Sequence, residues 1–238
     1  MARADGGGWT GRLGTFGLAA AIAGPLAAHL ELVAPLVGFL TMAIGLLLAV
    51  VSLLVGLVAV VRGGGAASGR AMLPGLVVVA TVAVVLATTG RGDHPRINDI
   101  TTDTERPPIF VAAPSLPANA HRDMGYPGES FAPQQRAGYP DLAALRLAVP
   151  PDEAYAKVLR AAQATEGWEI IREDAAARAV EGTETSWLFR FRDDFVIEIR
   201  PDGDGSVVHM RSKSRDGRGD MGVNAARIRA FFARLAAA

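Results

Sequence analysis

The chain has 238 residues, a formal net charge of zero, no cysteine and a hydrophobic fraction of 50%. The lack of cysteine excludes a disulfide framework, thiolate catalysis and cysteine-ligated zinc or iron–sulfur sites, and the neutral charge argues against a general nucleic-acid-binding protein. The charges are unevenly placed, because residues 1–90 hold only six of the 48 charged side chains. The sequence therefore joins two physically different parts.

Residues 1–90 are predicted to form a membrane anchor. Glu31 is the one charged residue in the range 13–61, and a helix needs roughly 20 apolar residues to cross ~30 Å of hydrocarbon. A cleaved signal peptide is the alternative for the first apolar run, since Arg3 and Arg12 precede it. We expect three transmembrane helices, at about 13–30, 36–61 and 71–89.

The arginines predict the orientation of this anchor. Arg3 and Arg12 flank the first span, and Arg62 and Arg70 lie between the second and third, whereas the loop between the first two spans has no lysine or arginine. Lysine and arginine are enriched in cytoplasmic loops. The N-terminus is therefore expected in the cytoplasm, and everything after residue 90 in a periplasm or its equivalent.

Residues 91–151 are predicted to combine a juxtamembrane motif with a proline-rich extended segment. Nine of the fourteen prolines fall in residues 104–151, a density that argues against helices and strands. A flexible linker is one interpretation. We favour a segment that lies on the globular domain and buries its apolar side chains, which are Phe110, Val111, Tyr126, Phe131 and Tyr139.

Residues 152–238 are predicted to be globular. Proline and two acidic residues begin a helix that runs from Pro151 to about Thr165, and a second amphipathic helix covers about 222–235. Between them lie four strand-like runs, at 168–172, 178–182 extending toward Phe191, 195–200 and 206–212. This order predicts a two-layer α+β domain, with an antiparallel sheet of about four strands and helices on one face.

Two long motifs frame the part of the chain after the anchor. The first is His94-Pro95 and Asn98-Asp99-Ile100-Thr101-Thr102-Asp103, before Pro107-Pro108. The second is Arg211-Ser212-Lys213-Ser214-Arg215, Gly217, Asp220-Met221-Gly222-Val223-Asn224 and Arg227-Ile228-Arg229. Over about 92–237 the chain resembles a bacterial family, domain of unknown function 1499. The resemblance implies membrane-spanning segments in front of the domain, here in a bacterial inner membrane, and implies no activity, cofactor or catalytic residue.

One candidate site is a basic cluster near the last helix. Residues 209–234 carry seven lysines and arginines against two aspartates, and a helix N-terminus attracts anions. The alternative is structural: the arginines pair with acids such as Asp194 or Asp220, and a serine or asparagine caps the helix. The predicted anion-binding donors are Arg211, Ser212, Ser214, Arg215 and Asn224.

The juxtamembrane motif is a second candidate. Its oxygen and imidazole groups are of the kind that holds a divalent cation, but Asx and Ser/Thr turns account for the same string without a metal. We favour turns, and we also expect Asp99 or Asp103 to meet the basic cluster. The motif residues are His94, Asn98, Asp99, Thr101, Thr102 and Asp103.

These features predict a membrane-anchored, non-catalytic extracytoplasmic domain that serves envelope structure or interaction. The sequence displays no nucleophile–base set and no metal cluster, so we predict no catalytic residue, metal or cofactor. The glycine-rich run at 217–222 lacks the second parallel strand that a dinucleotide fold requires. The alternative function is a binding module or enzyme for an anionic envelope metabolite or lipid headgroup. The expected partners are the lipid bilayer and an anionic molecule or envelope component, with no nucleic acid.

Overall fold

A computed structural model describes residues 6–63, 66–89 and 94–237 of the chain. The chain divides into two compact units. One consists of Met1–Arg91 with Trp187–Arg190, and the other of Gly92–Ser186 with Phe191–Ala238. They are called the helical unit and the C-terminal unit.

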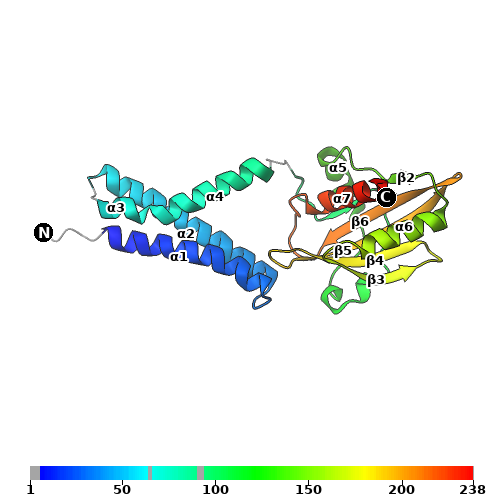
Figure 1. Ribbon diagram of the computed structural model, residues 1–238, viewed down its shortest axis with the longest axis horizontal. Helices are drawn as coiled ribbons and strands as arrows, with labels where there is room; N and C mark the ends of the chain where they lie inside the picture. The colour runs from blue at the N-terminus through cyan, green and yellow to red at the C-terminus, as the bar shows by residue number, and fades with distance from the viewer. Residues whose placement is uncertain (1–5, 64–65, 90–93, 238) are drawn as a thin grey trace. The chain divides into compact units, whose positions relative to one another are not determined.

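The helical unit contains α1 (Gly6–His29), α2 (Pro35–Val61), the short α3 (Ala66–Ala71) and α4 (Leu73–Thr89) (Figure 1). Among the described residues, α2 is the one helix long and apolar enough to cross a membrane, while Leu73–Ala83 is apolar but shorter. The residues before the predicted third span were expected to be loop, but α3 occupies part of them. The number of spans therefore stays a prediction.

α1 and α2 pack backbone against backbone through pairs of glycines. A Cβ atom added to Gly45 would lie 2.5 Å from the carbonyl oxygen of Gly17, and one added to Gly38 would lie 2.6 Å from that of Gly24. Only glycine permits such an approach, which is a common way for helices to associate in a bilayer. Large apolar side chains point outward instead, and they include Phe16, Ile22, Leu40, Ile44, Leu47 and Leu54.

The C-terminal unit is built on a six-stranded antiparallel sheet with the strand order β1-β6-β5-β4-β3, and β2 also pairs with β6. The tight turn between β5 and β6 contains Gly203, whose φ of 60° suits the Asp-Gly chemistry of this segment. The strands are β1 (Asp99–Thr101), β2 (Leu145–Leu147), β3 (Trp168–Asp174), β4 (Ala179–Thr185), β5 (Arg192–Asp202) and β6 (Gly205–Ser214).

The predicted antiparallel α+β class is confirmed, and two of the expectations about its strands, their number and the length of β4, need correction. The sheet gains two strands, β1 and β2, that were not predicted, because both are three-residue strands that pair with the long β6 rather than with a sequence neighbour. β4 ends at Thr185 and does not extend toward Phe191. Arg190 adopts a left-handed conformation, with φ of 62°, that no regular strand accommodates.

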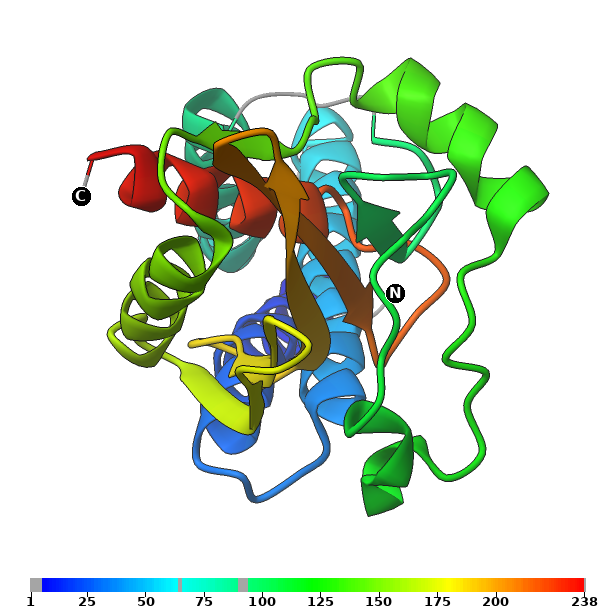
Figure 2. The same cartoon turned by 90° about the vertical axis from the view of Figure 1, so that its right-hand side faces the viewer.

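α6 (Pro151–Gln163) and α7 (Val223–Ala237) cover one face of the sheet (Figure 2). Phe195, Ile197 and Ile199 alternate along β5 toward these helices and are at most 3% exposed. The ring of Trp168 stacks on Phe195 with centroids 4.0 Å apart. The period-two pattern of β5 therefore sends its apolar side chains to the helical layer. The opposite side of the sheet is called the outer face.

The proline-rich segment is more regular than predicted, and it packs on both sides of the sheet: Phe110 and Ala113 lie against Val196 on the outer face, whereas Tyr139 joins the core on the helical face. It contains 3-10 turns at Ala113–Ser115 and Pro117–Asn119 and a helix, α5 (Gly128–Gly138), that was not expected because Pro133 lies inside it. α5 is fixed by tertiary contacts: the Gln135 side chain accepts the Thr101 N–H at 3.0 Å and donates to the Thr101 carbonyl at 2.6 Å. These bonds offset the backbone bond that proline removes.

The expectation that this segment buries its apolar side chains holds for part of the set. Phe110 is 5% exposed and packs on Val196, and Tyr139 is 4% exposed within the main core. Phe131 is partly buried against the same core. Val111 is 56% exposed, so its predicted burial was wrong. In an extended chain successive side chains point to opposite sides, so burying Phe110 turns Val111 outward.

Candidate functional site

The outer face of the sheet carries charged side chains that are paired within the protein. The first pair joins Arg211, a predicted anion-binding residue on β6, to Asp99 of β1. Arg211 donates from Nε to Oδ1 at 2.9 Å and from Nη2 to Oδ2 at 2.8 Å. The side chains of Asp99 and Arg211 are 0% and 2% exposed, and Lys213 adds a further bond to Asp99 at 2.9 Å. The expected meeting of Asp99 with the basic cluster is therefore observed.

The guanidinium of Arg211 uses four of its five N–H groups within the protein. Besides the two bonds to Asp99, it donates to the carbonyl oxygens of Pro108 at 3.2 Å and Met124 at 2.9 Å. Its carbon atom lies 4.8 Å from the centroid of the Phe110 ring and 5.5 Å from that of Tyr126. Burial, and then the nearby Asp99, raise the pKa of Tyr126 to about 12. Arg211 thus ties the proline-rich segment to the sheet.

Arg215 is engaged with a second buried carboxylate. It donates from Nη2 to Oδ1 of Asp194 at 2.6 Å, and the side chain of Asp194 is 0% exposed. Arg122 and Asn119 of the proline-rich segment also donate to Asp194, at 3.3 and 3.0 Å, and Thr183 donates to it at 3.3 Å. The Arg215–Asp194 pair is the one that the structural interpretation of the basic cluster predicted.

The remaining predicted donors form one buried network with Arg227. Ser212 donates to the Asn224 side chain at 2.8 Å, and Asn224 donates to the Ser214 hydroxyl at 2.9 Å. Arg227 donates to the Ser212 hydroxyl at 2.6 Å and pairs with Asp193 and Glu184. The fold thus brings Ser212, Ser214 and Asn224 together but fills their hydrogen-bonding capacity internally, which supports the structural interpretation.

The start of α7 is capped by an acid rather than by a serine or asparagine. Asp220 accepts the backbone N–H groups of Gly222 and Asn224, both at 2.9 Å. These are N–H groups that an anion at the helix start would use. The cap is therefore built from the chain itself, and Asp220, predicted as a partner of the arginines, takes the capping role that was predicted for a serine or asparagine.

The juxtamembrane motif separates into a strand and a turn. The backbone of residues 99–101 pairs with residues 211–213 as β1, so the prediction of turns was wrong for this part. The strand forms because a partner distant in sequence supplies its hydrogen bonds. The turn prediction holds at Asp103, whose carboxylate accepts the N–H groups of Glu105 and Arg106 at 3.1 and 2.8 Å. Within the described ranges no group of three or more His, Asp or Glu side chains is placed to hold a metal ion.

The other motif residues also have structural partners. Asn98 donates to the carbonyl of Gly217 at 2.8 Å. The Thr102 hydroxyl accepts the Met210 N–H at 3.0 Å, which extends the pairing of β1 with β6. His94 lies against Tyr139, with ring centroids 6.1 Å apart. Each of these contacts holds a motif residue against another segment of the C-terminal unit.

A third buried carboxylate, on Glu181 of β4, holds the proline-rich segment in a bend. It accepts the N–H groups of Val111, Ala112 and Ala113, all at 3.0 to 3.1 Å. Arg172 compensates its charge at 3.2 Å, and the side chain of Glu181 is 0% exposed. This carboxylate therefore fixes the backbone that borders the cavity described next.

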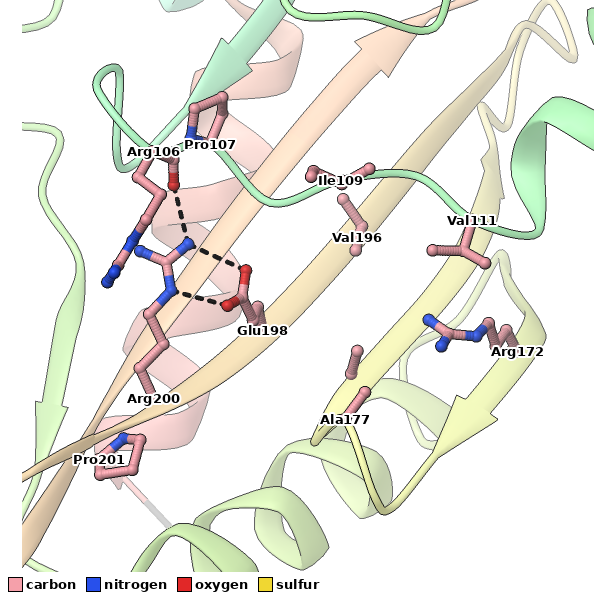
Figure 3. A pocket seen from close by; sticks show the side chains of 11 residues that line it. Arg106, Pro107, Ile109, Val111, Arg172, Ala177, Val196, Glu198, Arg200 and Pro201 are labelled. Carbon is pink, nitrogen blue, oxygen red and sulfur yellow. Dashed lines mark hydrogen bonds and ion pairs between the residues drawn. The ribbon is translucent and has the colours of Figure 1, made fainter.

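A cavity of about 730 Å³ lies on the outer face between this bend and the β3–β4 hairpin (Figure 3). We call it the outer-face groove. Its floor is formed by side chains of β5 and its walls by the proline-rich segment and the hairpin. The lining residues are Arg106, Pro107, Ile109, Val111, Arg172, Ala177, Ala179, Val196, Glu198, Arg200 and Pro201.

One end of the groove is held by an ionic cluster around Arg200. Arg200 donates to both carboxylate oxygens of Glu198, at 2.7 and 2.9 Å, and to Asp103 at 2.7 Å. It also donates to the backbone carbonyl of Arg106 at 2.8 Å. Hydrogen bonding to Glu198 raises the pKa of Arg200. Burial disfavours the charge of Asp103, but the Arg106 N–H and the Arg200 guanidinium outweigh it and lower its pKa.

Arg106 differs from the other two arginines of the groove. Its side chain is exposed and, in the part of the chain that the structure describes, forms no ion pair, whereas Arg172 and Arg200 each pair with two carboxylates. Ile109 and Val111 are 74% and 56% exposed beside it. No sequence motif marks this groove, because four separate segments supply its walls. The one local sequence feature that indicates the groove is the run Ile109-Phe110-Val111. Because side chains alternate along an extended chain, burial of Phe110 leaves Ile109 and Val111 exposed to solvent.

The fold and these paired charges describe a small α+β domain attached to an apolar helical segment. The family described as "Protein of unknown function (DUF1499)" matches residues 99–235, which is more than half of the chain. The chain belongs to this family. No curated protein matches it.

One solved structure to which the chain is similar is a crystal structure of TTHA0849 from Thermus thermophilus. The sequences are 11% identical, the match covers 40% of this chain and 84% of that chain, and the TM-score is 0.21. A similarity of this size says nothing about the function of the C-terminal unit.

Proposed function

We propose that this chain is a membrane-anchored protein whose C-terminal unit is a non-catalytic extracytoplasmic domain of the bacterial envelope. The observation that carries the proposal is the surface of the helical unit, on which large apolar side chains are exposed while small residues are buried. Gly38, Gly45 and Ser52 are buried between its helices, while leucine, isoleucine and phenylalanine side chains are exposed. Water disfavours such a surface and lipid tails accept it.

Three spans, at about 13–30, 36–61 and 71–89, fit this proposal better than one. α1 packs along α2 through its glycines, so both helices share the same surroundings. The uneven distribution of arginines supports a cytoplasmic N-terminus and an extracytoplasmic C-terminal unit. The bacterial inner membrane is the membrane that this orientation and the family imply.

Extraction and reporter fusions test the anchoring and the orientation. We expect the full chain to stay in the membrane pellet after alkaline carbonate. An alkaline phosphatase fused after residue 238 is expected to be active, and a green fluorescent protein at the same place to be dark. Release of the chain by carbonate would contradict the anchor. A bright fluorescent fusion would contradict the orientation alone.

The absence of a reactive arrangement in the groove supports a non-catalytic role. None of the residues lining the outer-face groove is a serine, threonine, histidine or tyrosine, and its one carboxylate, Glu198, is held by Arg200. We expect no turnover of ester or phosphoester substrates by the purified full chain. Turnover that disappears in Glu198→Gln would contradict this part of the proposal.

A second candidate function, binding of an anionic envelope molecule, is favoured by the position of Arg106. The donors predicted for such a ligand, around Arg211 and Arg215, are occupied by Asp99 and Asp194. Arg106 instead lines a cavity and, among the described residues, forms no ion pair. Titration of the full chain with octanoate, in phosphatidylcholine nanodiscs, tests this function, and an absence of binding would contradict it.

A further inference from the structure

We infer that the outer-face groove binds an amphiphile with one apolar chain and one anionic end, a carboxylate or a phosphate, whose charged end contacts Arg106. The inference names the ligand class for the anion-binding function proposed above and rests on that function. It does not depend on the orientation of the membrane anchor.

The charges of the groove leave one guanidinium able to pair with a ligand. The Arg172 guanidinium pairs with Glu181 and Asp174, and that of Arg200 with Glu198 and Asp103. Arg106 is the groove arginine without an ion pair among the described residues. A ligand with one anionic end can pair with Arg106, whereas a polyanion would also meet these four carboxylates, which outnumber the three arginines. Arginine suits the role because its planar fork matches carboxylate and phosphate oxygens.

The apolar surface of the groove calls for a chain attached to that anion. Ile109 and Val111 are exposed on one wall, and Val196, 1% exposed, lies at the floor. Figure 3 shows Ile109 and Val196 between the Arg106–Arg200 end of the groove and the Arg172 end. An apolar chain laid along the exposed side chains of Ile109 and Val111 removes them from water, which is the main source of affinity for such ligands.

The wall of the groove that carries Ile109 and Val111 is held in place before a ligand binds. Phe110, between the two exposed residues, is buried against Val196 and under Arg211, and Glu181 holds the backbone N–H of Val111. Binding therefore does not have to order this segment, which lowers the entropic cost. The cavity of about 730 Å³ falls within the range of roughly 300–1,000 Å³ that holds small ligands.

An acidic peptide fits the groove less well. An extended peptide usually binds by adding a strand to a free sheet edge. The floor of the groove is the face of β5, which is paired with β4 on one side and β6 on the other. It presents side chains rather than a row of free backbone groups. A molecule recognised by one charge and one apolar chain suits such a surface.

Calorimetric titration of the full chain in phosphatidylcholine nanodiscs, with empty nanodiscs subtracted, tests the inference. The probes are octanoate, octyl phosphate, acetate, octanol and triglutamate. We expect octanoate and octyl phosphate to bind, and acetate, octanol and triglutamate to bind at least tenfold more weakly. Arg106→Ala should weaken octanoate binding at least tenfold, and Val111→Asn should weaken octanoate and octanol together.

Arg218→Ala is the matched control, because Arg218 is an exposed arginine of the basic cluster that does not line the groove. It should leave octanoate binding unchanged. Equal binding of octanoate by Arg106→Ala and the unaltered chain would overturn the inference, as would acetate or triglutamate binding as tightly as octanoate. Loss of binding in Arg218→Ala alone would support the general anion-binding function and place it at the basic cluster instead.

Discussion

Asp99→Asn is expected to destabilise the C-terminal unit strongly. The carboxylate of Asp99 compensates two cations, Arg211 at 2.8 Å and Lys213 at 2.9 Å, whose side chains are 2% and 9% exposed. Asparagine keeps the shape but removes the charge, so both cations stay buried without compensation. Removing one partner of a buried ion pair costs about 3–5 kcal/mol. Because a domain typically has about 5–15 kcal/mol of stability, a large share is lost.

Urea unfolding of the full chain in detergent micelles measures this loss. Trp168 reports on the domain, since it stacks on the core residue Phe195, and Trp9 and Trp187 are replaced by phenylalanine in all samples. A second substitution, Arg211→Met, in the Asp99→Asn background is expected to recover part of the loss. It removes one of the two uncompensated charges, although it leaves the carbonyl groups of Pro108 and Met124 without a donor.

Asp141→Asn is the matched control for this experiment. Asp141 also pairs with an arginine, Arg229, at 2.7 Å, but the two side chains are 60% and 41% exposed. Exposed pairs contribute about 0–1 kcal/mol, so the control should unfold close to the unaltered chain. If Asp99→Asn unfolds at the same urea concentration as Asp141→Asn, the reasoning from burial is refuted.

Three further outcomes are expected. Gly45→Val should lower the thermal stability of the helical unit in detergent, because its Cβ meets the α1 backbone, whereas Gly8→Val, with open space around it, should not. Glu181→Gln weakens three hydrogen bonds to a charged acceptor, which contribute about 1.5–3 kcal/mol each, so amide hydrogen exchange at residues 111–113 should accelerate; unchanged protection there would contradict this role. Burial lowers the pKa of His209 from its ordinary value of 6.5 in the folded chain. Just below pH 6.5 the His209 side chain is therefore protonated in the unfolded chain but still neutral in the folded one, which favours unfolding. The melting temperature of the domain should therefore fall as the pH drops from about 7 to 5, and His209→Gln should make that fall shallower; parallel curves would argue against it.

Local pattern was enough to predict several elements of the C-terminal unit. The four long strands, β3 to β6, and the helices α6 and α7 each carry their own periodicity, and the turn at 202–205 carries its own chemistry. The strands at 99–101 and 145–147 lack such a signal, because three residues are too few to show a period. α5 was hidden by Pro133, whose cost is offset by the contact of Gln135 with the backbone of Thr101.

The candidate sites, too, could be predicted from the sequence only in part. Composition could show that Arg211 and Arg215 belong to a basic cluster, but both interpretations of that cluster, a ligand site or internal pairs, fitted the sequence. Asp99 and Arg211 are 112 positions apart in the chain, so only the fold could bring them together. The outer-face groove was missed because each lining segment is ordinary by itself.

Composition and periodicity alone predicted that the first part of this chain suits lipid and the second suits water, and they determined the main helices and strands. These properties depend on neighbouring residues, which the sequence lists in order. The tertiary structure alone decided which charges compensate each other and which arginine of the groove has no ion pair among the described residues. Those outcomes depend on desolvation and distance between residues far apart in the chain, and neither quantity exists until the sheet has formed.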